Sequence, residues 1–196
     1  MDDVTLSRWY AVYVRSRYEK KVHQLLMEQQ VTSFVPLIEV MRQWSDRKKK
    51  VAEPLFRGYV FVNIEYRKES ISVLDTDGVV KFIGIGRTPS IIADREIDWL
   101  KRLVREPGAI TGTVNTFPAG QRVKVLAGPF KDFEGVIVRA GREARLVVFF
   151  DSIMQGVEVT IFADYLAPLG KTAGATPDPD GEKEERGRVE RHILGL

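Results

Sequence analysis

The chain has 196 residues, which suits one ordinary domain or two small ones, and apolar residues make up 44% of it, enough for a packed core. It contains no cysteine, which excludes disulfides, thiolate metal sites and cysteine nucleophiles. No apolar run reaches the ~18 residues that a membrane span needs, and no signal-peptide pattern opens the chain, so we expect a soluble cytoplasmic protein.

The net charge is only +3, but basic residues gather in two clusters within the first fifty residues. The first contains Arg15, Arg17, Lys20 and Lys21, and the second lies within residues 42–50. Clustered Lys and Arg side chains favour contact with phosphate, and such contact weakens as the salt concentration rises. The alternative is that both clusters are solvated surface.

The first hundred residues alternate between strand-like and helix-like segments, which predicts an α+β domain with a mostly antiparallel sheet over residues 1–106. Ser16 is placed to cap the first helix, and Asp94 is a good N-cap for the last. In chain order the predicted elements are a strand over 8–14, a helix over 17–30, a strand over 31–36, a hairpin with arms 39–42 and 50–53, a strand over 59–65, a helix over 67–75, a strand over 79–83, and a helix from 94 that stops before Pro107.

The rest of the chain has a different composition. Residues 107–118 are rich in Gly, Pro and Thr and carry no charge after residue 106, which predicts an interdomain linker. Residues 119–169 contain five short Val-rich segments without a helix between them, which predicts a small five-stranded β-barrel. Residues 170–196 turn to Gly, Pro and charge, which predicts a disordered tail. The predicted barrel strands cover 121–126, 135–140, 144–150, 156–162 and 166–169.

The sequence contains no group of residues at the spacing that catalysis or metal binding requires. Its two histidines, His23 and His192, have no partner at ligand spacing, and the carboxylates at the start of the last helix are explained by capping. The Gly84-Ile85-Gly86 run lacks the third glycine of a dinucleotide fingerprint. The sequence therefore predicts a binding protein without enzymatic activity, metal ion or cofactor.

Two motifs carry the most information. In residues 53–62 (EPLFRGYVFV), Pro54 ends the preceding element, and strand alternation places Tyr59 and Phe61 on the face opposite Val60 and Val62. One face can then form the core while the other is left bare as a binding platform. In residues 120–136 (GQRVKVLAGPFKDFEGV), a Gly-Pro turn separates two strands of the predicted barrel.

The first motif, together with Trp9-Tyr10, resembles the N-terminal NGN-type domain of the NusG family of bacterial transcription elongation factors, except that Arg57 replaces the usual proline. The second motif resembles the KOW motif, which occurs in the same family and in some ribosomal proteins. The resemblance covers residues 7–169 and implies an NGN-type domain followed by a KOW (SH3-like) barrel.

The resemblance implies a monomeric elongation and antitermination factor that binds RNA polymerase, bridges its cleft and suppresses pausing by favouring the closed clamp. In the family, one surface contacts the clamp helices of the largest subunit and another contacts the opposing subunit. The positions that match the clamp-helix surface are Tyr13, Tyr59, Phe61, Phe82 and Ile85, and those that match the second contact are Ser70, Ile71 and Ser72.

Specialised RfaH-like paralogues, which serve long polysaccharide operons, also bind the non-template DNA strand. The run over 42–50 and the barrel segment 153–156 favour this branch, so we expect antitermination at specific operons. One relative holds its second domain as a helical hairpin against the first, but the β-branched residues here favour a barrel. The matching DNA-contact positions are Arg15, Arg17, Tyr18, Lys21 and Thr76, and the matching interdomain pair is Glu53 and Arg145.

Two other functions stay open. The first is the housekeeping NusG factor, which supports elongation and Rho-dependent termination. The second is a KOW-containing ribosome-associated protein that binds ribosomal RNA, which would leave the aromatic face of the first domain unexplained. In the transcription factors, the KOW domain would recruit Rho or a small-subunit ribosomal protein.

Overall fold

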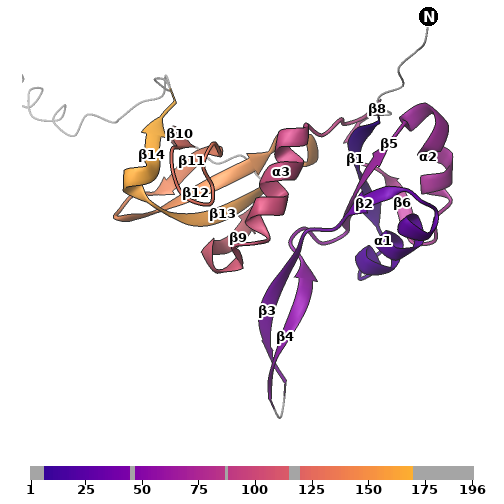
Figure 1. Ribbon diagram of the computed structural model, residues 1–196, viewed down its shortest axis with the longest axis horizontal. Helices are drawn as coiled ribbons and strands as arrows, with labels where there is room; N and C mark the ends of the chain where they lie inside the picture. The colour runs from indigo at the N-terminus through magenta and orange to yellow at the C-terminus, as the bar shows by residue number, and fades with distance from the viewer. Residues whose placement is uncertain (1–6, 45–46, 87, 115–119, 170–196) are drawn as a thin grey trace, which may run out of the picture.

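The computed structural model describes residues 7–44, 47–86, 88–114 and 120–169, which form an α+β first part followed by an all-β part (Figure 1). The first part is built on a four-stranded sheet in the order β2-β5-β1-β6, in which every neighbouring pair is antiparallel. No helix among the described residues is long and apolar enough to cross a lipid bilayer. The strands of this sheet are β1 (Arg8–Val14), β2 (Thr32–Phe34), β5 (Tyr59–Ile64) and β6 (Val79–Phe82).

The two faces of this sheet bury different cores, as strand alternation predicts. Val12, Val60 and Val62 pack beneath α1 (Glu19–Glu28) and α2 (Tyr66–Leu74). On the other face, Ala11 and Phe61 belong to a second core that also contains residues of α3 (Asp94–Leu103) and of the all-β part. The second face is therefore covered over much of its area.

Two hairpins extend from the first part. The long one consists of β3 (Leu37–Gln43) and β4 (Lys48–Pro54), and it projects well away from the body (Figure 1). This confirms the predicted hairpin and lengthens both of its arms. The short one consists of β7 (Gly84–Ile85) and β8 (Thr88–Pro89) and was not predicted, because two-residue strands leave no periodicity in the sequence.

The all-β part is a six-stranded sheet in the order β14-β10-β11-β12-β13-β9. The five strands predicted for residues 119–169 are all present. They are β10 (Arg122–Val125), β11 (Glu134–Arg139), β12 (Glu143–Phe150), β13 (Gln155–Phe162) and β14 (Leu166–Pro168), with the 3-10 turns η2 (Asp151–Ile153) and η3 (Ala163–Tyr165) between them.

The sixth strand, β9 (Ile110–Val114), lies within the predicted linker and pairs with β13. A 3-10 turn, η1 (Pro107–Ala109), precedes it, so residues 107–114 have regular structure, which their sequence did not predict. Four of the five residues of β9 are β-branched, which favours a strand, but the Gly and Pro around them obscured that signal. Residues 115–119 and the predicted tail, 170–196, lie outside the described residues, and the domain boundaries stay predictions.

Both predicted helix caps are wrong. Tyr18 is the N-cap of α1, and no side chain caps it, because Arg17 between Ser16 and the helix has a left-handed φ of 65°. Ala93 is the N-cap of α3, and its N–H donates to the carboxylate of Glu96 at 3.2 Å. Asp94 is therefore the first residue inside the helix, where its charge still favours the helix dipole.

Candidate binding surfaces

An exposed aromatic pair lies at one end of the central strand pair, β1 and β5. Tyr13 is directly opposite Tyr59 in the strand register, and their ring centroids are 6.0 Å apart at an angle of 85°. The ring of Tyr13 is held against Gly58, whose φ is +80° and where a Cβ atom would come within 2.8 Å of the ring. Tyr13 is 41% exposed and Tyr59 is half-buried, so the pair is available for contact.

Phe61 does not belong to this exposed surface. Its side chain is 0% exposed and packs against Phe34 with ring centroids 6.2 Å apart. The prediction that Phe61 contacts a partner is therefore wrong, because α3 and the all-β part bury the face on which it lies. Alternation correctly placed Phe61 beside Tyr59 but could not show which part of that face is covered.

Phe82 and Ile85 lie apart from the aromatic pair. Phe82 is opposite Val12 in the register, which puts it on the helix-covered face, where it packs against Tyr10 and Tyr66. The grouping of Phe82 with Tyr13 on one surface is therefore wrong. Ile85 lies in the short hairpin and is 88% exposed, more than any other large apolar side chain that the structure describes.

The residues predicted to contact the far side of the polymerase cleft lie on α2. Ile71 is 71% exposed, Ser72 is exposed and Ser70 is half-buried. Because α2 covers the face of the sheet opposite to the one that carries Tyr13, Ile71 and the aromatic pair lie on two different sides of the first part.

Three of the residues predicted to contact DNA form one cluster. The Nζ atom of Lys21 lies 4.9 Å from the ring centroid of Tyr18, and the guanidinium carbon of Arg15 lies 5.9 Å from it. Both cations also pair with Asp77, Arg15 at 3.3 Å and Lys21 at 2.7 Å. The hydrogen bond from Lys21 lowers the pKa of Asp77 and raises that of Lys21. The cluster therefore presents an aromatic ring with a net positive charge.

The other two predicted DNA contacts do not join that cluster. Thr76 is only 4% exposed, and its hydroxyl lies within hydrogen-bonding distance of Gln29 and of the carbonyl oxygen of Ser72. The prediction for Thr76 is therefore wrong, because its hydroxyl is used within the fold. Arg17 lines a cleft between the start of α1 and the long hairpin.

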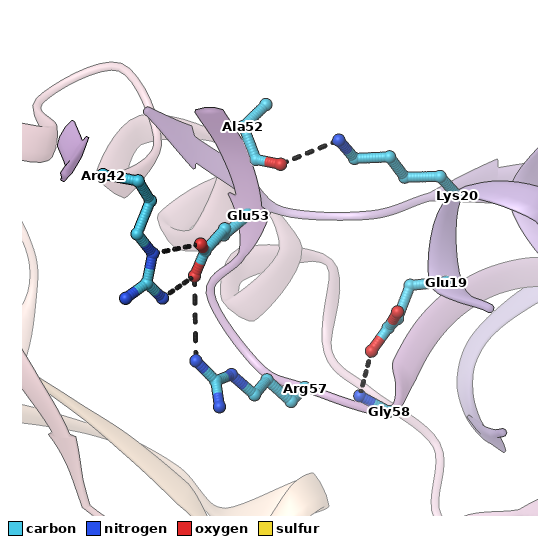
Figure 2. Close-up of polar contacts among 7 residues, drawn as sticks. All are labelled: Glu19, Lys20, Arg42, Ala52, Glu53, Arg57 and Gly58. Atoms are coloured by element: carbon cyan, nitrogen blue, oxygen red, sulfur yellow. Dashed lines mark hydrogen bonds and ion pairs between the residues drawn. The ribbon is translucent and has the colours of Figure 1, made fainter. Parts of the chain in front are cut away.

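Glu53 and Arg145 do not pair with each other. Arg42 donates two hydrogen bonds to Glu53, of 2.6 and 2.7 Å, and Arg57 lies 3.7 Å from the same carboxylate (Figure 2). Arg145 pairs with Glu158 on the adjacent strand at 3.1 Å. The predicted interdomain pair is therefore wrong, since each residue finds a partner within its own sheet.

A cleft of about 770 Å³, which we call the hairpin cleft, lies between the start of α1, the long hairpin and the turn before β5. Its walls are tied together by Lys20, which donates to the carbonyl oxygen of Ala52 at 2.7 Å, and by Glu19, which accepts from the N–H of Gly58 at 2.7 Å (Figure 2). The prediction missed this cleft because its lining comes from separate segments. The side chains that line the cleft include Tyr13, Arg17, Lys20, Arg42, Trp44 and Arg57.

The all-β part packs against α3 and the turn before β5. Arg102 of α3 donates to the carbonyl oxygens of Pro129 and Lys131 and lies 4.7 Å from the ring centroid of Phe133. Phe56, three residues before Tyr59, contacts Phe150 with ring centroids 5.8 Å apart. α3 therefore lies between the two sheets (Figure 1), a contact that the sequence did not predict.

Each of the two parts of the chain matches a known protein family or motif. Residues 7–101 match the family model described as "Transcription termination factor nusG", and residues 119–147 match the KOW motif. The chain is similar to the transcription termination/antitermination protein NusG of Pseudomonas aeruginosa, with 34% identity over 147 residues that cover 69% of this chain and 83% of that protein.

A protein of the same name from Staphylococcus epidermidis is 29% identical over 183 residues, which cover 86% of this chain and 99% of that protein. The fold is similar to the solved structure described as "Domain interaction in Thermotoga maritima NusG", with a TM-score of 0.51 over 84% of this chain and 98% of that one. At 24% identity, this second likeness bears on the fold alone.

Proposed function

Since the chain belongs to the NusG family of transcription termination and antitermination factors, we propose that it binds RNA polymerase through the Tyr13–Tyr59 pair. The observation that carries the proposal is that Tyr13 remains 41% exposed although its neighbours in β1 are buried. Large aromatic side chains at the centre of an interface commonly supply most of the binding energy. The partner expected from the family resemblance is the pair of clamp helices in the largest subunit.

The second proposed contact is the exposed surface of α2 around Ile71, which would meet the opposing subunit. Because this surface and the aromatic pair lie on different sides of the first part, one rigid body could touch both sides of the polymerase cleft. A factor that binds the closed clamp more tightly than the open one shifts the population toward the closed form. No chemical step by the factor itself is needed, as befits a non-enzymatic family.

A binding experiment with purified core polymerase tests this proposal. The double variant Tyr13→Ala/Tyr59→Ala should bind at least about tenfold more weakly than the wild-type chain, since it loses two aromatic contacts. Phe162→Ala is the matched control, because Phe162 is a comparably exposed aromatic residue, at 51%, on the all-β part. Equal affinity of the double variant and the wild type, with folding intact by circular dichroism, would rule out this surface.

A second candidate function is antitermination at specific operons, favoured by the Arg15–Tyr18–Lys21 cluster. Cations beside an aromatic ring suit phosphate contact and base stacking on an exposed DNA strand. The named relatives favour the general elongation and termination factor instead. A transcription assay with Rho separates the two: the general factor should increase Rho-dependent termination on an ordinary template, and the specialised factor should reduce termination only on templates that carry its DNA element.

The all-β part is proposed to recruit a further partner, either Rho or a small-subunit ribosomal protein, as its KOW motif implies. A pull-down with the full chain as bait and each purified partner alone would distinguish them. Recovery of neither would limit the function to polymerase binding. Sedimentation with ribosomes in the absence of polymerase would instead favour a ribosome-associated protein.

A further inference from the structure

The all-β part carries an exposed apolar patch beside its last strand, β14. The patch, which we call the η3 patch, consists of Leu126, Phe162 and Tyr165, which are 53%, 51% and 37% exposed. The rings of Phe162 and Tyr165 meet at a centroid distance of 5.9 Å, and the N–H of Leu126 donates to the carbonyl oxygen of Tyr165 at 2.7 Å. We propose that residues 188–196 of the same chain dock on this patch.

The η3 patch is a preformed surface. Val125, which pairs with Leu166 of β14, is buried, so strand alternation turns the next residue, Leu126, outward. Residues that face each other across an antiparallel pair point to the same side, which places Leu126 beside Tyr165. The ring of Tyr165 lies against Gly128, where a Cβ atom would come within 3.3 Å of it. The patch therefore needs little rearrangement before it binds.

The size of the patch favours an occupant from the same chain. A stable interface between separate molecules commonly buries at least about 1,200 Å² in total, which three side chains cannot supply. A tethered segment needs much less, because its effective concentration is about 1 mM and a Kd of about 0.1 mM then fills about nine-tenths of the sites. A separate protein or a second copy of the chain has no such advantage.

The segment can reach the patch without stretching the chain. Beyond β14 the chain passes Leu169, whose N–H donates to the carbonyl oxygen of Arg122 at 2.9 Å. From Arg122 to Leu126, at one side of the patch, is about 13 Å at the rise of a β-strand. A random coil as long as residues 170–187 spans about 20–25 Å between its ends. The intervening residues are therefore long enough to let the segment fold back.

The sequence of this segment suits an apolar patch. Val189, Ile193, Leu194 and Leu196 are the only large apolar residues in the sequence after Leu169. Val189, Ile193 and Leu196 follow helical spacing, so one face of a helix would present all three. A short amphipathic segment binds an apolar surface through side chains at this spacing. Residues 170–187 have no such side chains, which singles out 188–196 as the occupant.

The charges around the patch complement those of the segment. Two exposed acids and one exposed base border it, next to Phe162, Ala163 and Tyr165. The segment carries two arginines and one glutamate, Arg188, Arg191 and Glu190. Such pairs at a rim fix the orientation of a bound segment more than its affinity. The bordering residues, none of which forms an ion pair within the described ranges, are Glu143, Asp164 and Arg142.

Paramagnetic broadening in NMR spectra tests the proposal on the full chain. Because the chain has no cysteine, Gly195→Cys gives a single site for a nitroxide label. Amide peak intensities are compared between the oxidised and the reduced label. We expect the amides of the η3 patch to lose most of their intensity, and the loss to stay the same on dilution. Polymerase is absent, so the result is independent of the proposed function.

Two double variants should relieve this broadening. Phe162→Ala/Tyr165→Ala removes the patch, and a tenfold loss of affinity would lower the occupancy from about nine-tenths to about half. Ile193→Ser/Leu196→Ser removes the apolar face of the segment and leaves every described residue unchanged. The matched control is Met154→Asn. Met154 is 59% exposed at the other end of β13, and asparagine tolerates its left-handed φ of 53°.

Several outcomes would overturn the proposal. Absent broadening, broadening spread evenly over the all-β part, or broadening centred on another surface would each show that the segment does not dock here. So would equal broadening in the wild type and in both double variants. A mixture of spin-labelled chains without ¹⁵N and unlabelled ¹⁵N chains checks for contact between molecules: broadening of the patch in that mixture would assign it to a second copy.

Discussion

The indole of Trp99 in α3 stacks on the ring of Phe133 in the all-β part, with 5.0 Å between the ring centroids and 30° between the planes. The guanidinium carbon of Arg102, three residues further along the helix, lies 4.7 Å from the centroid of the same Phe133 ring. Two residues of one helix therefore hold the second sheet against the first part of the chain.

Arg102→Ala should loosen this contact. The substitution leaves the carbonyl oxygens of Pro129 and Lys131 without their donor and removes the cation from Phe133, so the two sheets should separate more often. Small-angle scattering should show a larger radius of gyration for the variant than for the wild type. Arg105→Ala is the control, because Arg105 follows α3 and is exposed. An unchanged scattering profile would show that Arg102 does not hold the sheets together.

Gly58→Ala should destabilise the first part by about 1–3 kcal/mol, because alanine is strained at a φ of +80° and its Cβ atom would press on the ring of Tyr13. Urea unfolding measures the loss. Gly108→Ala is the control, since a Cβ atom at Gly108 meets no atom within 4 Å and its φ is not left-handed. Equal unfolding midpoints for the two variants would contradict the close packing described at Gly58.

Phe61→Ala should mainly reduce stability, whereas Tyr13→Ala should mainly reduce binding to polymerase. Phe61 is fully buried, so its truncation should cost about 3–5 kcal/mol of unfolding free energy. Tyr13 is largely open, so its truncation should cost less stability but weaken polymerase binding. Chemical unfolding and polymerase affinity, measured on both variants, check this. A small stability loss for Phe61→Ala would mean that the covered face opens readily.

The pKa of Glu53 should lie below its ordinary value of 4.5, because Arg42 donates hydrogen bonds to the charged carboxylate. A carboxyl whose pKa is lower in the folded state stabilises the fold above its unfolded pKa and loses that contribution as the pH falls through the folded pKa. The hairpin should therefore loosen only in acid, below the ordinary Glu range.

Carbon-detected NMR titration of Glu53 measures this pKa directly. Arg42→Gln should raise it toward the ordinary value, and Arg57→Gln should raise it less, because the hydrogen bond from Arg42 is the largest cause of the shift. A titration midpoint that does not move in Arg42→Gln would show that the pair does not persist in solution.

The sequence predicted the four strands of the first sheet, the three helices of the first part and the long hairpin, because each has a local period or a local turn signal. It also placed Tyr59 and Phe61 on one face. It could not give the register between strands, which puts Phe82 opposite Val12 and hence on the other face from Tyr13. Register depends on partners that are distant in the sequence.

The same reasoning explains the other errors at the candidate surfaces. Whether an aromatic face is bare depends on what covers it, and α3 with the all-β part covers Phe61. The hydroxyl of Thr76 looks free in the sequence but lies next to Gln29, which is 47 residues away. Matching positions to the family pattern therefore gave the residue types but could not show which of these side chains are exposed.

The contacts of the first turn of α1 restrict insertions and deletions at this point of the chain. Three consecutive residues hold three separate segments: Glu19 the turn before β5, Lys20 strand β4, and Lys21 the loop after α2. One residue inserted or deleted there would rotate the following side chains by about 100° around the helix axis. Homologues that keep these three anchors must therefore keep the spacing of this turn.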